Sequence, residues 1–184
     1  MNSPERIILG IDPGTNIMGY GVIKAHGKEP VLLSLGITDM RKEKDPYKTL
    51  QTIFRDVIAL IDQYHPDELA IEAPFYGKNV QSMLKLGRAQ GAAIAAALSR
   101  DIPIFEYAPR KIKMAITGQG SASKEQVSDI LQRILHFKTD TKNLDATDGL
   151  AAAVCHFYQA KHAENGKSFT GWNDFLRKNP DRLK

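Results

Sequence analysis

The first forty residues alternate between apolar runs and short polar segments in a way that predicts β-structure. Residues 6–12 form an apolar run that ends in the Asp-Pro-Gly turn of residues 12–14, a pattern typical of a buried strand followed by a tight turn. Residues 18–25 and 30–40 are rich in β-forming residues, and the polar segment HGKE between them indicates a hairpin. Because short loops join the three segments, we expect antiparallel strands.

The remainder of the chain alternates between helical and strand patterns. Apolar residues recur at helical spacing from Leu50 to Ile61, which predicts an amphipathic helix that ends near Pro66. Ser123 and Gln126 have the spacing of a capping box. The other predicted elements are a buried strand at 68–74, a helix at 79–100, a strand at 102–107, a short helix at 109–116, a helix from 123 and a last helix at 144–161. This order predicts an α/β domain with a mixed sheet.

A chain of 184 residues with 42% apolar content fits one globular domain. We assign it to residues 1–162 and expect the polar, basic tail at 163–184 to be flexible. We find neither a signal-peptide pattern nor an apolar stretch near the roughly 18 residues of a membrane span, and therefore expect a cytoplasmic protein. Cys155 is the only cysteine, which excludes an intramolecular disulfide. We interpret it as a core thiol, with His156 at the edge of the core.

Four acidic residues occupy positions where a carboxylate is costly unless something binds it. Asp12 and Glu72 end predicted buried strands, and Asp145 and Asp148 lie three residues apart on one face of the last helix. An ionised group at the end of a buried strand loses hydration worth several kcal/mol unless a cation or hydrogen bonds compensate. Oxygen-only ligands suit Mg²⁺ or Mn²⁺, and two such ions suit in-line attack on a phosphodiester.

Each of these acidic residues also has a purely structural interpretation. Asp12 could cap the Asp-Pro-Gly turn, and Glu72 could point into solvent at a strand end. Asp145 and Asp148 are also favoured by the dipole of a helix in its first turn. The alternatives stay open for each residue taken alone.

The charge balance changes once these four residues are set aside. The chain has 25 Lys and Arg against 21 Asp and Glu, and its formal charge of +4 becomes +8 without the four acids. A basic surface around an acidic, cation-binding centre fits a polyphosphate substrate. Net charge alone is equally well explained by solubility.

Five segments, taken together and in this order, resemble the RuvC family of bacterial Holliday-junction resolvases over residues 6 to about 160. They are GIDPGTNIMGYGVI, LAIEAPFYGKN, LKLGRAQGAAIAAAL, EYAPRKIKMAITGQGSASKEQV and LDATDGLAAAVCH. The resemblance implies an RNase H-like fold, a three-layer domain with a five-stranded mixed sheet. It also implies a homodimer that cuts a four-way DNA junction by paired symmetric nicks in recombination and repair, and an association with the branch-migration proteins RuvA and RuvB.

The same resemblance assigns roles to individual residues. It implies that Asp12, Glu72, Asp145 and Asp148 hold two Mg²⁺ ions, for which Mn²⁺ is a possible substitute, and that hydrolysis leaves 5′-phosphate and 3′-hydroxyl ends. No covalent enzyme intermediate is needed.

Further residues match positions that the family places near the DNA. Lys113 and Lys124 match basic residues close to the active site, where a Lys could stabilise charge on the phosphate; solvated helix-surface lysines are the alternative. We expect Arg110 and Lys111 to contact phosphates. Phe75 matches an aromatic residue that stacks on a base. Core packing is its alternative, and Tyr76 is a rival for the same role.

The predicted helix at 79–100 carries a strip of small residues, Gly87, Gly91 and Ala95. The strip allows close approach of another backbone, either the twin helix of a dimer or the sheet of the same chain.

Three other functions remain. The GIDPGT turn also resembles the first phosphate loop of actin-like and sugar-kinase ATPases, but those proteins duplicate the domain and this chain has one copy. A nuclease relative that processes ribosomal RNA is the second, and the Phe75 and Lys113/Lys124 segments favour junction DNA over it. A catalytically inactive DNA-binding protein is the third, and it would be expected to lack one of the four acids.

Overall fold

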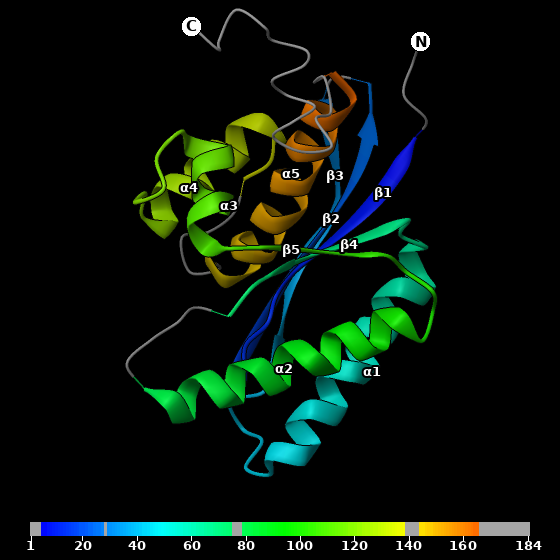
Figure 1. Cartoon of the computed structure of the whole chain (residues 1–184), viewed down its shortest axis with the longest axis vertical. Coiled ribbons are helices and arrows are strands. Elements are labelled where there is room, and N and C mark those ends of the chain that lie inside the picture. The colour runs from blue at the N-terminus through cyan, green and yellow to red at the C-terminus, as the bar shows by residue number, and fades with distance from the viewer. Residues whose placement is uncertain (1–4, 28, 75–78, 139–143, 166–184) are drawn as a thin grey trace, which may run out of the picture.

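A computed structural model describes residues 5–27, 29–74, 79–138 and 144–165. Within them the chain forms the predicted elements in the predicted order (Figure 1), with boundaries shifted by a few residues. They are β1 (Arg6–Asp12), β2 (Ile17–His26), β3 (Glu29–Asp39), α1 (Pro46–Tyr64), β4 (Glu68–Glu72), α2 (Val80–Leu98), β5 (Ile104–Tyr107), α3 (Pro109–Thr117), α4 (Lys124–Ile134) and α5 (Leu144–Asn165).

The largest shifts are at helix ends. α1 begins at Pro46, before the first residue of the apolar pattern, because Asp45 caps it by accepting a hydrogen bond from the Tyr47 N–H. α5 continues to Asn165, past the domain boundary expected at residue 162. No helix in the described part of the chain is long and apolar enough to cross a membrane.

The five strands form one mixed sheet in the order β3-β2-β1-β4-β5. β1 pairs antiparallel with β2, and β2 antiparallel with β3, as expected for the hairpin. β4 lies parallel to β1 and to β5, and Ile11 of β1 is opposite Ile71 of β4. The central position of β1 places its carboxyl end beside that of β4.

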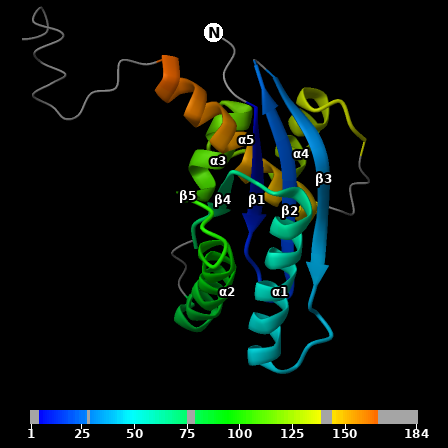
Figure 2. The same cartoon turned by 90° about the vertical axis from the view of Figure 1, so that its right-hand side faces the viewer.

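The two faces of the sheet carry different helices, which gives the three layers visible in Figures 1 and 2. Successive side chains of a strand point to opposite faces. Ile8 and Ala70 therefore pack with α3, α4 and α5, whereas Leu9 and Ile71 pack with α1 and α2. The same alternation directs Asp12 and Glu72 toward the face that α5 covers.

α5 lies unusually close to β1 and β2 because glycines line the contact. A Cβ atom at Gly10 would lie 2.2 Å from the carbonyl oxygen of Gly149, and one at Gly21 would lie 2.4 Å from the Cα of Leu150. Any larger residue at these positions would push the helix away from the sheet. The glycines thus bring the first turns of α5 down to backbone contact with the strands.

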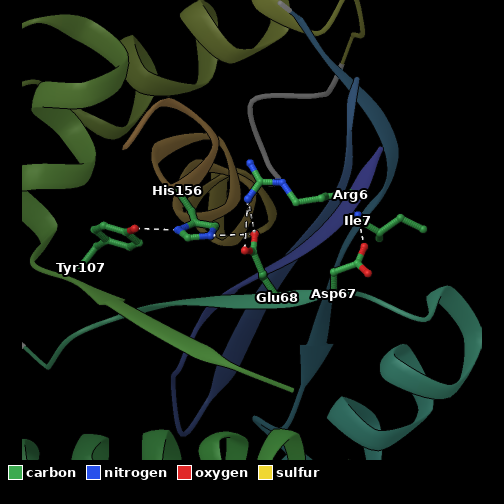
Figure 3. Close-up of polar contacts among 6 residues, drawn as sticks. All are labelled: Arg6, Ile7, Asp67, Glu68, Tyr107 and His156. Atoms are coloured by element: carbon green, nitrogen blue, oxygen red, sulfur yellow. Dashed lines mark hydrogen bonds and ion pairs between the residues drawn. The ribbon is translucent and has the colours of Figure 1, made fainter. Parts of the chain in front are cut away.

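A buried polar chain ties α5 to the strands beside it (Figure 3). The His156 ring makes hydrogen bonds to the Tyr107 hydroxyl at 2.6 Å through Nδ1 and to Glu68 Oε2 at 3.0 Å through Nε2. Arg6 forms an ion pair with Glu68 at 3.2 Å, and Phe105 stacks on the His156 ring. The expectation of a core-edge histidine is wrong, because the His156 side chain is only 3% exposed. Burial there requires partners for both ring nitrogens, and Tyr107 and Glu68 provide them.

Candidate active site

Two of the four acidic residues meet at the carboxyl ends of β1 and β4. Asp12 and Glu72 each follow the Ile11–Ile71 pair by one residue, on the sheet face covered by α5. Both line a pocket of about 230 Å³ that Pro13, Gly14, Ala73, Pro74 and Leu86 complete. The pocket opens at the edge of the sheet, where a substrate can reach the two carboxylates.

α5 supplies the other two acidic residues from its first turns. Gly19 of β2 is paired with Asp12 in the β1–β2 ladder, and a Cβ atom at Gly19 would lie only 1.9 Å from the carbonyl oxygen of Asp145. The start of α5 therefore rests on the strand pair at Asp12. Asp148 follows one turn later and faces the same region, since its charge acts on both Asp12 and Glu72.

The four carboxylates form one electrostatic unit. The pKa of Asp12 is raised to about 7, chiefly by burial and then by the charges of Asp148 and Asp145, against the opposing charge of Lys124. The pKa of Glu72 is raised to about 8, chiefly by burial and then by repulsion from Asp12 and Asp148, against the opposing charges of Lys124 and Lys113. Both carboxyl groups are therefore costly to ionise here, first because they lose water and second because they lie near other carboxylates.

Lys124 is the cation in direct contact with this unit. Its Nζ donates to the Asp148 carboxylate and, at 3.3 Å, to Asp145 Oδ1. Burial lowers the pKa of Lys124, but hydrogen bonds and charge from Asp148 and Asp145 raise it more, so the net shift is upward. Ser123 and Gln126 form the predicted capping box, which fixes the start of α4 and hence the position of Lys124.

The other predicted DNA-binding residues lie at different distances from the carboxylates. Lys113 of α3 is close enough for its charge to lower the pKa of Glu72 and of Asp148. Lys111 places its Nζ 5.1 Å above the Tyr107 ring, and Arg110 packs across Gly120. Both are exposed on α3. Phe75 and Tyr76 lie outside the described residues.

Sequence reasoning missed a buried residue that holds the end of β4. The Gln90 side chain of α2 donates from Nε2 to the backbone oxygen of Glu72 at 3.4 Å and to Glu106 Oε2 at 2.8 Å. Gln90 is 8% exposed among buried alanines of the same helix. A lone amide in a run of small apolar residues was the available signal, because a buried amide must find hydrogen-bond partners.

The four carboxylates fit a divalent cation by their chemistry. As the described side chains are arranged here, no three Asp, Glu, His or Cys residues enclose a metal position, and Lys124 bonds both α5 carboxylates. The group nevertheless suits hard divalent cations, because its ligands are all carboxylate oxygens. By formal charge, the four ionised carboxylates exceed the single charge of Lys124, which bonds two of them.

Known proteins resemble this chain along most of its length. Residues 8–156 match the family described as Crossover junction endodeoxyribonuclease RuvC. A protein of that name from Bacteroides fragilis is 63% identical over 182 residues, which cover 98% of this chain and 97% of the relative. The relative from Christiangramia forsetii is 62% identical over 98% of this chain and 94% of its own length.

Solved structures agree with the sequence relatives. The structure described as T. thermophilus RuvC in complex with Holliday junction substrate has a TM-score of 0.79 and 28% identity, and the match covers 86% of this chain and 96% of that one. The yeast mitochondrial resolvase Ydc2, at 13% identity and a TM-score of 0.60, shares the fold. The chain belongs to the RuvC family of crossover junction endodeoxyribonucleases, with the RNase H-like fold that the sequence predicted.

Proposed function

We propose that this chain is a structure-selective endonuclease that resolves Holliday junctions by paired symmetric nicks. The observation that carries the proposal is the meeting of Asp12, Glu72, Asp145 and Asp148 at one edge of the sheet. Family membership supports it, because the relatives are named as crossover junction endodeoxyribonucleases over nearly the full length of this chain.

The four carboxylates are the proposed ligands of the cations. Two Mg²⁺ ions, for which Mn²⁺ is a possible substitute, would supply the Lewis acidity for attack by water on the phosphodiester, leaving 5′-phosphate and 3′-hydroxyl ends. Asp12 and Glu72 would hold the cations in their ionised form, so cation binding would compete with the protonation that burial favours at both residues.

The neighbouring basic residues have supporting roles in the same proposal. Lys113 and Lys124 place positive charge beside the carboxylates, where the phosphate gains negative charge during hydrolysis. Arg110 and Lys111, exposed on α3, would contact backbone phosphates farther along the strand. Phe75 keeps the base-stacking role that the family resemblance implies.

We also propose a homodimer built on α2. Gly87 and Gly91 have no atom within 4 Å of an added Cβ, so the strip of small residues does not pack on the sheet of its own chain. Leu84 and Leu98, exposed by 55% and 59%, extend the strip along the helix. An apolar strip of this kind suits a two-fold partner, and two sites related by a two-fold axis suit symmetric nicks.

The dimer has a simple test in a charge placed on the strip. Gly91→Arg should shift the chain from dimer to monomer in sedimentation velocity, because a buried unpaired charge is costly at an interface. Gln51→Arg adds the same charge at an exposed site on α1 and should leave the dimer intact. Association with RuvA and RuvB and action in the cytoplasm belong to the same proposal and rest on family membership.

Cleavage of end-labelled DNA tests the activity itself. A four-way junction and a linear duplex of the same arms are incubated with Mg²⁺ or with EDTA, using the unmodified chain, Asp145→Asn and the control Asp129→Asn, which changes an exposed Asp of α4. We expect paired nicks in the junction alone, only with Mg²⁺, and not by Asp145→Asn. Equal cutting of duplex and junction, or full activity of Asp145→Asn, would overturn the proposal.

A further inference from the structure

A second pocket adjoins the one that contains Asp12 and Glu72. It has a volume of about 310 Å³ and lies between the loop after β1, the start of α1 with the segment before it, and the second and third turns of α2. Gly14 and Leu86 line the first pocket, and their chain neighbours Thr15 and Lys85 line the second. The two pockets are therefore consecutive along the same loop and the same helix.

The second pocket is basic, because three cations and one carboxylate line it among the described residues. Lys44, Lys85 and Arg88 line it, and none of the three has an ion-pair partner among the residues that the structure describes. By contrast, Arg41, Arg55 and Arg100 are each paired with an Asp. A cluster of exposed cations without partners attracts anions from solution.

The acidic residues next to this pocket are already used by the backbone. The Glu43 carboxylate, which lines the pocket, accepts hydrogen bonds from the N–H groups of Lys44 and Asp45 at 2.9 and 3.0 Å. The Asp45 carboxylate caps α1. Neither carboxylate makes a described contact with the three cations. Glu43 is the one acidic residue in the described part of the lining, so these lining side chains carry a net positive charge.

The wall of the pocket also offers an aromatic surface and a hydroxyl group. Tyr47, in the first turn of α1, is 77% exposed, and Thr15 lies on the opposite loop. An exposed aromatic ring beside two or three cations is typical of surfaces that bind a nucleic-acid strand, where the cations contact phosphates and the ring contacts a sugar or a base.

We infer that this pocket, defined by Lys44, Tyr47, Lys85 and Arg88, binds a backbone phosphate of the junction strand next to the phosphate that is cut. The inference rests on the proposed nuclease function. The basic residues expected to bind DNA, Arg110 to Lys124, lie on α3 and α4, which cover the α5 face of the sheet. The pocket lies with α1 and α2, which cover the other face. A strand bound at both places crosses the sheet edge at Asp12 and Glu72.

Salt-dependent binding tests the inference. Junction affinity is measured over a range of salt concentrations for Lys44→Ala and for the double variant Lys85→Ala/Arg88→Ala. Both are made in the Asp145→Asn background, which we expect to bind the junction without cutting it. Removing one cation that neutralises a phosphate should flatten the slope of log affinity against log salt by about 0.9. Lys48→Ala is the matched control, because Lys48 is exposed in the same turn of α1 but does not line the pocket. A slope for the double variant equal to that of Lys48→Ala would overturn the inference.

Neutral phosphates locate the contact. Phosphates near the cleavage position are replaced one at a time by methylphosphonates. A methylphosphonate at one or two of these positions should weaken binding of the junction by the parent chain. The same substitutions should not weaken binding by the double variant, which already lacks the contact. Equal losses of affinity in both chains would overturn the inference. Lys85→Arg keeps the positive charge and should bind the junction like the parent.

Cleavage by the unmodified chain separates this inference from the proposed function. If that chain does not cut the junction, the proposed function fails as well. If it cuts and the slopes are unchanged, only the phosphate pocket fails.

Discussion

The carbonyl oxygen of Asp145 occupies the position next to Gly19 where any other residue would place its side chain. A Cβ atom there would lie 1.9 Å from that oxygen, and Gly19 is the residue paired with Asp12. The approach of α5 to β1, and with it the closeness of Asp145 and Asp148 to Asp12, thus depends on a missing side chain. A residue that has no side chain and no charge therefore sets the geometry of the carboxylates.

Gly19→Ala should therefore impair cleavage more than binding. The added methyl must push the start of α5 away from β2, and displacing a reacting group by about 1 Å can cost on the order of 100-fold in rate. We expect a fall of at least about tenfold in the single-turnover rate, and a loss of about 1 to 3 kcal/mol in the free energy of unfolding. Junction affinity should change little, because the basic residues keep their positions.

The control for this variant is Gly36→Ala on β3. The added methyl there meets only the end of the Tyr20 side chain, which can move. Gly36→Ala should keep the parent cleavage rate. A Gly19→Ala chain that cuts as fast as Gly36→Ala would show that the position of α5 tolerates the shift.

Divalent cations should stabilise the chain more at high pH than at low pH. The pKa of Asp12 is raised from 3.8 to about 7, and that of Glu72 from 4.5 to about 8. Between about pH 4 and pH 8 the folded chain thus binds more protons at these two residues than the unfolded chain, so without a cation their contribution to stability falls as the pH rises through this window. A cation that displaces these protons works against less competition above pH 8.

Thermal unfolding with and without Mg²⁺ at pH 5.5 and pH 8.5 checks this expectation. The rise in Tm caused by Mg²⁺ should be clearly larger at pH 8.5, and Asp12→Asn should reduce it. An equal rise at both values of pH, or one unaffected by Asp12→Asn, would mean that the ion binds elsewhere.

Lys124 should matter most when no divalent cation is bound. Its ammonium group bonds both Asp145 and Asp148. Lys124→Ala therefore leaves these two carboxylates and Asp12 without this neighbouring positive charge. We expect Lys124→Ala to lower Tm in EDTA at pH 8.5, and Mg²⁺ to restore most of the loss. Lys124→Arg should restore Tm in EDTA. Lys138→Ala, an exposed lysine after α4, is the control, and an identical loss of Tm for both alanine variants would contradict the role of Lys124.

The sequence predicted the features that depend on local pattern. The apolar patterns ended two predicted strands at Asp12 and Glu72, and a capping box placed Lys124 at the start of a helix. The family resemblance implied that the two carboxylates meet. What it did not predict depends on contacts between distant segments. One example is the strip of small residues on α2, which could face its own sheet or solvent. The packing of α2 against α1 and β5 decides between the two, and this packing cannot be predicted from helical spacing.

The burial of His156 is a second example. Residues 150–157 of α5 are buried one after another, because this helix has the sheet on one side and α3 and α4 on the other. When a helix is apolar on all sides, its hydrophobic periodicity does not show which face is buried. The partners of His156 come from β4 and β5, separated from it in sequence by 88 and 49 positions.

His156 leads to a prediction whose pH dependence is opposite to that of Asp12 and Glu72. Burial lowers the pKa of His156 below 6.5, against the opposing effect of Glu68. Below about pH 6.5 the unfolded chain therefore binds more protons at this residue, so its contribution to stability is lost as the pH falls. His156→Phe removes this loss of stability at low pH, but it leaves the Tyr107 hydroxyl without its hydrogen bond to the histidine ring.

We expect His156→Phe to cost about 1 to 3 kcal/mol in the free energy of unfolding at pH 7.5 and less at pH 5, measured by urea denaturation. Tyr107→Phe is the matched variant, because it removes the same hydrogen bond and keeps the titrating ring; its cost should not shrink at pH 5. If His156→Phe costs the same at both values of pH, the histidine takes up a proton without leaving Glu68, and the charged Glu68–His156 pair then clamps α5 to β4 across the whole range.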